Sequence, residues 1–239
     1  MGKSGFSACE VCAKIGSVKK SFGGRKMNYH ALLIEAGKRM LHSGLTVETW
    51  GNISVRDPET GLIYLTPSGM PYDTLVEDDV VVMDAEGNRV EGERKPTIEY
   101  AMHLGSMKNR PDVNAIIHTH PIYSQVFALL HEPILPVIDE AAQILGGPVG
   151  VTEYALPGSP EMARNAIGTL GGGAACLLAN HGAVCAGKDM DTAFRVCTVL
   201  EMTAQIYYMA RCIGNPKPID DEKIKYMKEF VSKSYGQGK

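Results

Sequence analysis

Residues 115–123 read AIIHTHPIY, an apolar run that ends in two histidines one residue apart. The run predicts a strand. Because side chains at i and i+2 of a strand point to the same face, a strand here would direct His118 and His120 toward one point. That is the geometry of two metal ligands if further donors lie nearby. Paired histidines also occur where no metal binds, so this stretch alone leaves both interpretations open.

The composition predicts an ordinary globular protein. Its 239 residues, 44% of them apolar, suffice for one large domain or two small ones around a buried core. The formal net charge of −3 gives no basic surface for nucleic acid or an anionic membrane. No apolar run approaches the roughly 20 residues that span a bilayer. We therefore expect a cytoplasmic protein that binds neither nucleic acid nor membrane.

The first 26 residues are predicted to be a peripheral extension. They are basic and glycine-rich, lack the apolar core of a secretory signal, and precede the first helical pattern, which begins after Met27. Cys9 and Cys12 form a lone CxxC in this extension. We expect two reduced thiols there, with a redox or metal role as the alternative. Residues 27–239 are then expected to form a single domain.

Helical and strand-like patterns are mixed along this domain without strict βαβ alternation. Helices are predicted at residues 28–44, 97–109, 121–130, 160–170, 189–212 and 220–233. Strands are predicted at residues 52–56, 62–66, 79–84 and 113–120, with a strand pair at 175–187. Asn28 is the expected N-cap of the first helix, and Pro121 the expected first residue of the third. The predicted fold is α/β, a mixed and largely antiparallel sheet between helical layers.

Two more metal donors can be placed from the sequence. His181 ends a second apolar strand beside Gly182, where the missing side chain lets a ligand approach the backbone. Glu99 begins a predicted helix, where its carboxylate could also simply complement the helix dipole. Taken alone, His181 is better interpreted as a turn histidine, and Glu99 as a carboxylate that complements the helix dipole. Together with His118 and His120, these residues offer three imidazoles and one carboxylate, a competent Zn²⁺ site.

Several segments carry a resemblance to a known family: GNISVR (51–56), LTPSGMPY (65–72), KPTIEYAMH (95–103), RPDVNAIIHTHP (110–121) and ANHG (179–182). From about Met27 to Tyr235 the chain resembles the class II aldolase/adducin family. The resemblance implies a three-layer α/β/α fold. It also implies one Zn²⁺ per subunit on His118, His120 and His181, with Mn²⁺ or Co²⁺ as other possible ions. Glu99 matches the family's acid/base glutamate, which also ligates the metal when no substrate is bound.

The resemblance further implies a phosphate pocket made by Asn52, Ser68, Gly69 and Thr97. Ile98 departs from the pattern, because the family has a hydroxyl residue there and isoleucine cannot donate a hydrogen bond. Backbone N–H groups at the start of the helix could still hold the anion.

Two positions bear on the reaction and the assembly. Glu140 falls where the aldolases have a tyrosine, and is closer to the base of the related dehydratases. Tyr235 matches a C-terminal tyrosine that reaches into a neighbouring subunit's site, although a mobile tail aromatic is the alternative. The resemblance thus implies a homotetramer with active sites at the subunit interfaces.

The function expected from this resemblance is zinc-dependent aldol cleavage. A ketose 1-phosphate of the L-fuculose 1-phosphate type would yield dihydroxyacetone phosphate and an aldehyde through a metal-bound enediolate. Glu99, where the epimerases usually have aspartate, favours cleavage over epimerisation. Dehydration with Glu140 as base, decarboxylation of a 3-oxo acid phosphate and epimerisation remain alternatives. A non-catalytic adducin-like scaffold would require a dismantled metal site, whereas all four donors are present.

Overall fold

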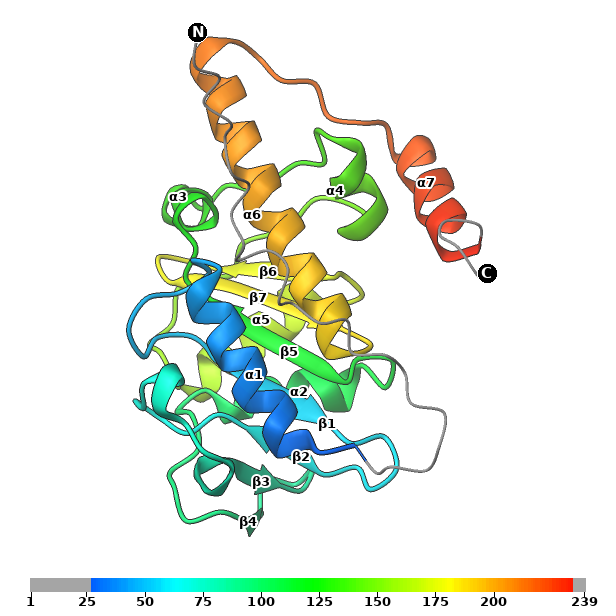
Figure 1. The fold of residues 1–239 in the computed structure, drawn as a ribbon. Coiled ribbons are helices and arrows are strands. Elements are labelled where there is room, and N and C mark those ends of the chain that lie inside the picture. Colours follow the sequence, from blue (N-terminus) through cyan, green and yellow to red (C-terminus); the bar gives the residue numbers. More distant parts are fainter. Residues whose placement is uncertain (1–26, 234–239) are drawn as a thin grey trace, which may run out of the picture.

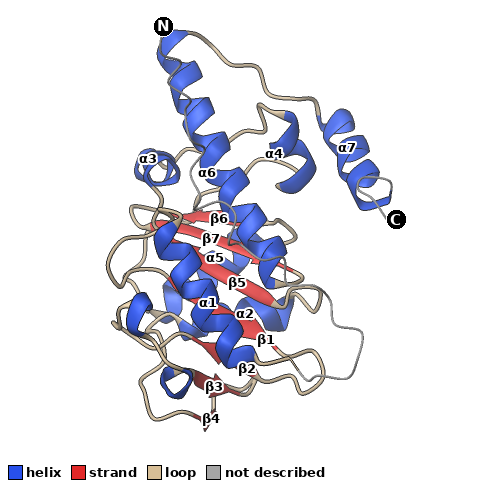
Figure 2. Cartoon of the chain, in the orientation of Figure 1, coloured by secondary structure: helices blue, strands red, loops and turns tan. Residues whose placement is uncertain are grey.

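The computed structural model describes residues 27–233, which form a sheet with helices on both faces (Figures 1 and 2). Within these residues the sheet has seven strands in the order β4-β3-β2-β1-β5-β7-β6. The strands are β1 (Asn52–Arg56), β2 (Ile63–Leu65), β3 (Val81–Met83), β4 (Arg89–Glu91), β5 (Ala115–Thr119), β6 (Ala175–Leu178) and β7 (Gly182–Gly187). Neighbouring strands pair antiparallel, and a parallel contact occurs as an isolated bridge between Val151 and Leu177. The predicted α/β fold with a largely antiparallel sheet is confirmed.

The helices form two layers. In Figure 1, α1 (Tyr29–His42) and α6 (Met190–Ile213) cross the front of the sheet, and α2 (Tyr100–Asn109) and α5 (Pro160–Leu170) lie behind it. Three further helices lie toward the β6 edge: α3 (Ile122–Leu130), α4 (Asp139–Ile144) and α7 (Asp221–Lys233). Two short 3₁₀ helices, η2 (Tyr72–Thr74) and η3 (Glu77–Asp79), follow β2. None of the described helices is both long and apolar enough to cross a membrane.

Each face of the sheet has its own hydrophobic core. All five residues of β5 are buried because helices cover both faces. Ile117 packs in the core under α1 and α6, whereas Ile116 packs in the core under α2 and α5. Full burial of one such side chain is worth about 1.5–3 kcal/mol. Because alternate residues share a face, His118 follows Ile116 onto the α2 side of the sheet.

The structure differs from the predicted elements mainly at the ends. Asn28 caps α1 as expected, since its Oδ1 accepts a hydrogen bond of 3.1 Å from the Ala31 N–H. Pro121 was predicted to be the first residue of its helix. It is instead the N-cap of α3, which begins at Ile122. The three-residue strand β4 and the six-residue helix α4 were not predicted. Both are short and mostly or partly exposed, so their apolar periodicity is too brief to read.

Candidate metal centre

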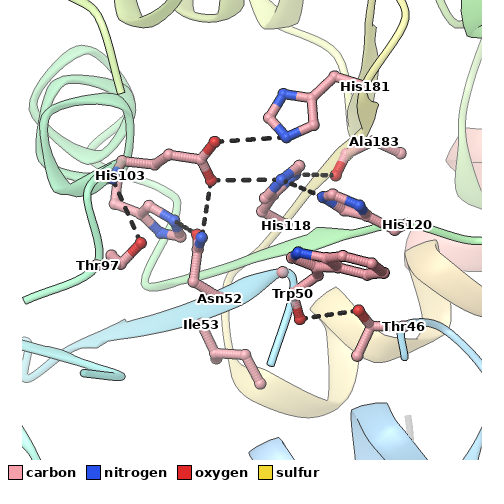
Figure 3. Close-up of polar contacts among 12 residues, drawn as sticks. Thr46, Trp50, Asn52, Ile53, Thr97, His103, His118, His120, His181 and Ala183 are labelled. Carbon is pink, nitrogen blue, oxygen red and sulfur yellow. Dashed lines mark hydrogen bonds and ion pairs between the residues drawn. The ribbon is translucent and has the colours of Figure 1, made fainter. Parts of the chain in front are cut away.

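Three histidines meet at one end of the sheet (Figure 3). His118 belongs to β5, His120 follows that strand, and His181 lies in the turn between β6 and β7. Their ligand atoms all lie within 4.8 Å of one another, and the Nε2 atoms of His118 and His120 are 2.9 Å apart. Zn–N distances are about 2.0–2.1 Å, so three nitrogens at this spacing fit the coordination sphere of one ion.

Gly182 permits this close approach. It begins β7, which pairs with β5 so that Thr119 lies opposite Ala183. A Cβ atom built on Gly182 would clash with the Thr119 carbonyl oxygen and would lie 3.1 Å from His120 Cδ2 and 3.2 Å from His118 Cε1. The glycine predicted to admit a ligand therefore also admits the imidazole rings themselves.

The turn that carries His181 is held by a second histidine. Asn180 adopts a left-handed conformation with φ of 55°, and its side-chain oxygen lies 2.7 Å from Nε2 of His131. An amide oxygen can only accept, so this Nε2 carries the proton. His131 itself ends α3 in the left-handed region. The contact fixes the conformation of the residue that precedes His181.

The three imidazoles are in the protonation state that a metal requires. Burial lowers the pKa of His118 to about 4. Burial, with the neighbouring His118 as the next cause, lowers the pKa of His120 to about 3 and that of His181 to about 4. All three are therefore neutral at pH 7. His118 Nδ1 donates to the Ala183 carbonyl at 3.0 Å, so its Nε2 lone pair faces the other two rings.

Glu99, at the start of α2, brings a carboxylate to the three histidines. It is the N-cap residue of α2, and its side chain is buried, with 3% of its surface exposed. Its Oε2 lies 3.3 Å from His118 Nε2, and its Oε1 lies 3.6 Å from His181 Nε2. The structure thus brings all four predicted donors together, three neutral nitrogens and one carboxylate. This donor set suits Zn²⁺.

A hollow of about 420 Å³ opens beside the cluster. The predicted phosphate-pocket residues all line it: Asn52, Ser68, Gly69 and Thr97. Among the described residues that line it, none is a lysine or arginine. An anion there would be held by neutral donors, such as hydroxyl and amide groups and the N–H groups at the start of α2.

The hollow is lined by apolar as well as polar side chains, a feature that the sequence reasoning missed. Trp50, Ile98 and Pro157 line it, with Trp50 57% and Ile98 59% exposed. The Trp50 ring is nearly parallel to that of His120, at 9° with the centroids 6.4 Å apart. Trp50 is the single tryptophan of the chain and precedes Asn52 by two residues, which was an available signal.

Glu140 is a predicted site residue that lies apart from the cluster. Glu140 is exposed on α4 and does not line the hollow. Within one chain, therefore, the structure does not bring it to the histidines. Tyr235 lies outside the described residues, as do Cys9 and Cys12 of the predicted extension.

His103 is a further site residue that the sequence reasoning missed. It lies one helical turn after Glu99 on α2 and is fully buried. Its Nε2 is 2.5 Å from the Asn52 side-chain oxygen, and the Asn52 amide nitrogen donates to Glu99 Oε2 at 2.7 Å (Figure 3). Glu99 and His103 are four residues apart on one predicted helix and so share a face, and this spacing could have identified His103 from the sequence.

Comparisons with known proteins agree with this fold and site. The family described as Class II Aldolase and Adducin N-terminal domain matches residues 31–208. The chain therefore belongs to this family, as the resemblance predicted, and its relatives place it with the family's enzymes. It is 38% identical over 206 residues to a 5-deoxy-D-ribulose 1-phosphate aldolase of Bacillus thuringiensis, covering 86% of this chain and 95% of that protein. It is 31% identical to the L-fuculose phosphate aldolase of Escherichia coli K12, covering 85% and 94%.

A solved structure is similar over the same region. It is an L-fuculose 1-phosphate aldolase, 39% identical, with a TM-score of 0.84 over 87% of this chain and 98% of the other.

Proposed function

We propose that this chain is a Zn²⁺-dependent aldolase that cleaves a ketose 1-phosphate into dihydroxyacetone phosphate and an aldehyde. The observation that carries the proposal is the convergence of three neutral imidazoles, with the Glu99 carboxylate 3.3 Å from His118 and 3.6 Å from His181. The relatives that bear aldolase names support the same reaction class.

The chemistry needs an electrophile and a proton carrier. Bound by His118, His120 and His181, Zn²⁺ would supply a Lewis acid for the negative charge that develops on the substrate oxygens. In cleavage, the C4 hydroxyl gives its proton to the Glu99 carboxylate and C4 becomes the aldehyde carbon, while the C3–C4 bond breaks and its electron pair remains on the C1–C3 fragment. Glu99 then delivers a proton to C3, which completes dihydroxyacetone phosphate. Its buried carboxylate is well placed because both oxygens already face the cluster.

The neutral rim of the hollow is proposed to hold the phosphate. Ser68, Gly69 and Thr97 supply hydroxyl and backbone donors, and the second amide hydrogen of Asn52 can turn toward the substrate. Ile98 offers no hydroxyl, so the anion would depend more on backbone N–H groups there.

We further propose that the sugar carries an apolar terminal group. Trp50, 57% exposed with its ring nearly parallel to that of His120, is an apolar surface beside the histidines, which suits a methyl or thioether end better than a hydroxymethyl end. Two relatives agree: the 5-deoxy-D-ribulose 1-phosphate aldolase, and a 5-methylthioribulose-1-phosphate/5-deoxyribulose-1-phosphate aldolase of Rhodospirillum rubrum, 35% identical over 205 residues. That second match covers 85% of this chain and 90% of the relative.

The assembly is also a proposal. Residues 27–239 would form the catalytic domain of a homotetramer, with residues 1–26 peripheral to it. Tyr235 of a neighbouring subunit would act on the C4 hydroxyl side of the substrate. The Glu140 side chain is exposed on α4. It would therefore act, if at all, in the site of another subunit.

A substrate panel tests the proposed function. The purified, zinc-loaded protein is incubated with 5-deoxyribulose 1-phosphate, 5-methylthioribulose 1-phosphate and L-fuculose 1-phosphate, and products are identified by mass. We expect dihydroxyacetone phosphate together with an aldehyde, formed fastest from the first two. Loss of water without a smaller aldehyde would instead indicate a dehydratase, and conversion without change of mass an epimerase.

A further inference from the structure

Four side chains form a continuous line of hydrogen bonds behind the metal cluster. Ser54 Oγ lies 2.7 Å from His103 Nδ1, His103 Nε2 lies 2.5 Å from Asn52 Oδ1, and Asn52 Nδ2 lies 2.7 Å from Glu99 Oε2. All four residues are buried, Ser54 and His103 completely. Polar groups placed this deeply must satisfy one another, because water cannot replace a lost partner.

The fold places these groups with little freedom. Asn52 and Ser54 are alternate residues of β1, so both side chains point to the α2 face, and Asn52 lies directly opposite His118 in the sheet. His103 lies on α2 one turn after Glu99, and its ring contacts both of these side chains. The helix therefore contributes both the carboxylate and the ring, and the strand contributes the groups that join them.

Each hydrogen bond in the line determines the direction of the next. An ionised Glu99 can only accept, so Asn52 must present its amide nitrogen and turn its oxygen to His103. That oxygen can only accept, so His103 Nε2 must carry the ring proton. Burial, with His118 as a lesser cause, lowers the pKa of His103 to about 3, so the ring is neutral and its Nδ1 accepts from the Ser54 hydroxyl.

We propose that His103 is a positioning residue for Glu99 and acts through Asn52. By donating to Asn52 Oδ1 it prevents the amide from reversing, and so keeps the amide N–H directed at Glu99 Oε2. A reversed amide would set its oxygen against the carboxylate, and Glu99 would rotate away from the cluster. The bond from Asn52 engages Oε2 and leaves Oε1, on the His181 side, to exchange a proton with substrate. The catalytic part of this inference rests on the proposed function.

Two substitutions separate positioning from general packing. In His103→Gln the terminal amide nitrogen falls near the Nε2 position and can still donate to Asn52. In His103→Asn the terminal atoms fall near Nδ1 and reach Ser54, but no donor reaches Asn52. Both replace a buried imidazole with a smaller amide, so each serves as the packing control for the other. Neither substitution replaces a candidate metal ligand.

The first measurement does not depend on activity. In ¹⁵N-labelled protein we expect His103 to show the neutral tautomer with hydrogen on Nε2. The Asn52 side-chain amide hydrogens should exchange slowly with solvent in the wild type and in His103→Gln, and at least about tenfold faster in His103→Asn. The opposite tautomer, or equal exchange in the two variants, would overturn the proposal.

The second measurement follows turnover and metal content. We expect His103→Asn to lower kcat by about 10–100-fold with little change in KM, and His103→Gln to restore most of that loss. Zinc content should stay at the wild-type value in both. Equal kcat values for the two variants would refute the positioning role. If the wild type itself cleaved no ketose 1-phosphate while the exchange pattern held, the proposed function would fail and the positioning of Glu99 would stand.

Discussion

Replacing Gly182 with alanine tests whether the spacing of the imidazoles determines metal affinity. The added Cβ would lie 3.1 Å from His120 Cδ2 and 3.2 Å from His118 Cε1, where ordinary contact begins at 3.4 Å. The rings must therefore move by about 0.2–0.3 Å, and the Thr119 carbonyl must move further. Metal–ligand distances tolerate only about 0.2 Å.

We therefore expect Gly182→Ala to weaken Zn²⁺ binding by at least about tenfold, the lower end of the effect of disturbing the surroundings of a metal site. Without metal, the free energy of unfolding should fall by about 1–3 kcal/mol, the usual cost of overpacking a buried region. Competition with a chelator of known affinity measures the first quantity. Denaturant unfolding of chelator-treated protein measures the second.

Gly168→Ala is the matched control. Gly168 lies within α5, and an added Cβ there meets nothing within 4 Å. Alanine should stabilise this helix by about 0.5–1 kcal/mol and leave zinc affinity unchanged. If Gly182→Ala bound zinc as tightly as the wild type, the argument from ring spacing would be wrong.

Three other predictions address the same site. Glu99→Gln should keep its zinc, since three imidazoles remain, and lose at least about 100-fold in kcat; near-normal turnover would move the proton transfer to another group. Zinc added to chelator-treated protein should change the fluorescence of Trp50, whose ring lies against His120, and His120→Ala should abolish the change. The third concerns pH. Burial holds the folded pKa of His103 at about 3, below its ordinary value of 6.5, so between these values the unfolded chain binds more protons. The free energy of unfolding of metal-free protein should fall as pH is lowered through this window, with His103 contributing at most about 2 kcal/mol between pH 7 and pH 5, and His103→Gln should show a correspondingly smaller fall.

Much of the fold could be predicted because its signals are local. The buried strand at residues 115–119 and the capped helix after Asn28 depend on apolar periodicity and on one capping side chain. The short elements β4 and α4 could not be read in this way, because three to six residues do not complete a recognisable period. Their conformation depends on what they pack against.

The grouping of the three histidines was predictable for a different reason. His118 and His120 were expected on one strand face, and His181 beside a glycine at the end of another strand, so local patterns already placed them at strand ends. The line of hydrogen bonds from Ser54 to Glu99 could not be predicted, because it depends on pairing between distant segments. Only the antiparallel register that sets Asn52 opposite His118 brings His103 and Ser54 into line with Glu99.

The apolar lining of the hollow was missed because exposure is a property of the folded chain. Trp50 and Ile98 are large apolar residues that a sequence pattern would assign to a core, yet both are more than half exposed beside the histidines. An exposed aromatic side chain in a hollow marks a binding surface more often than a structural one. This observation favours a sugar with an apolar end over one that ends in a hydroxymethyl group.

Metal-dependent cleavage is the central claim, and one measurement tests it most directly. Protein stripped by a chelator and protein reloaded with Zn²⁺ are each given 5-deoxyribulose 1-phosphate, and the release of dihydroxyacetone phosphate is followed together with metal content. We predict one Zn²⁺ per chain, no cleavage after stripping, and recovery on reloading that fails in His118→Ala and His181→Ala. Full turnover by metal-free protein, or full zinc content in both histidine variants, would contradict the claim.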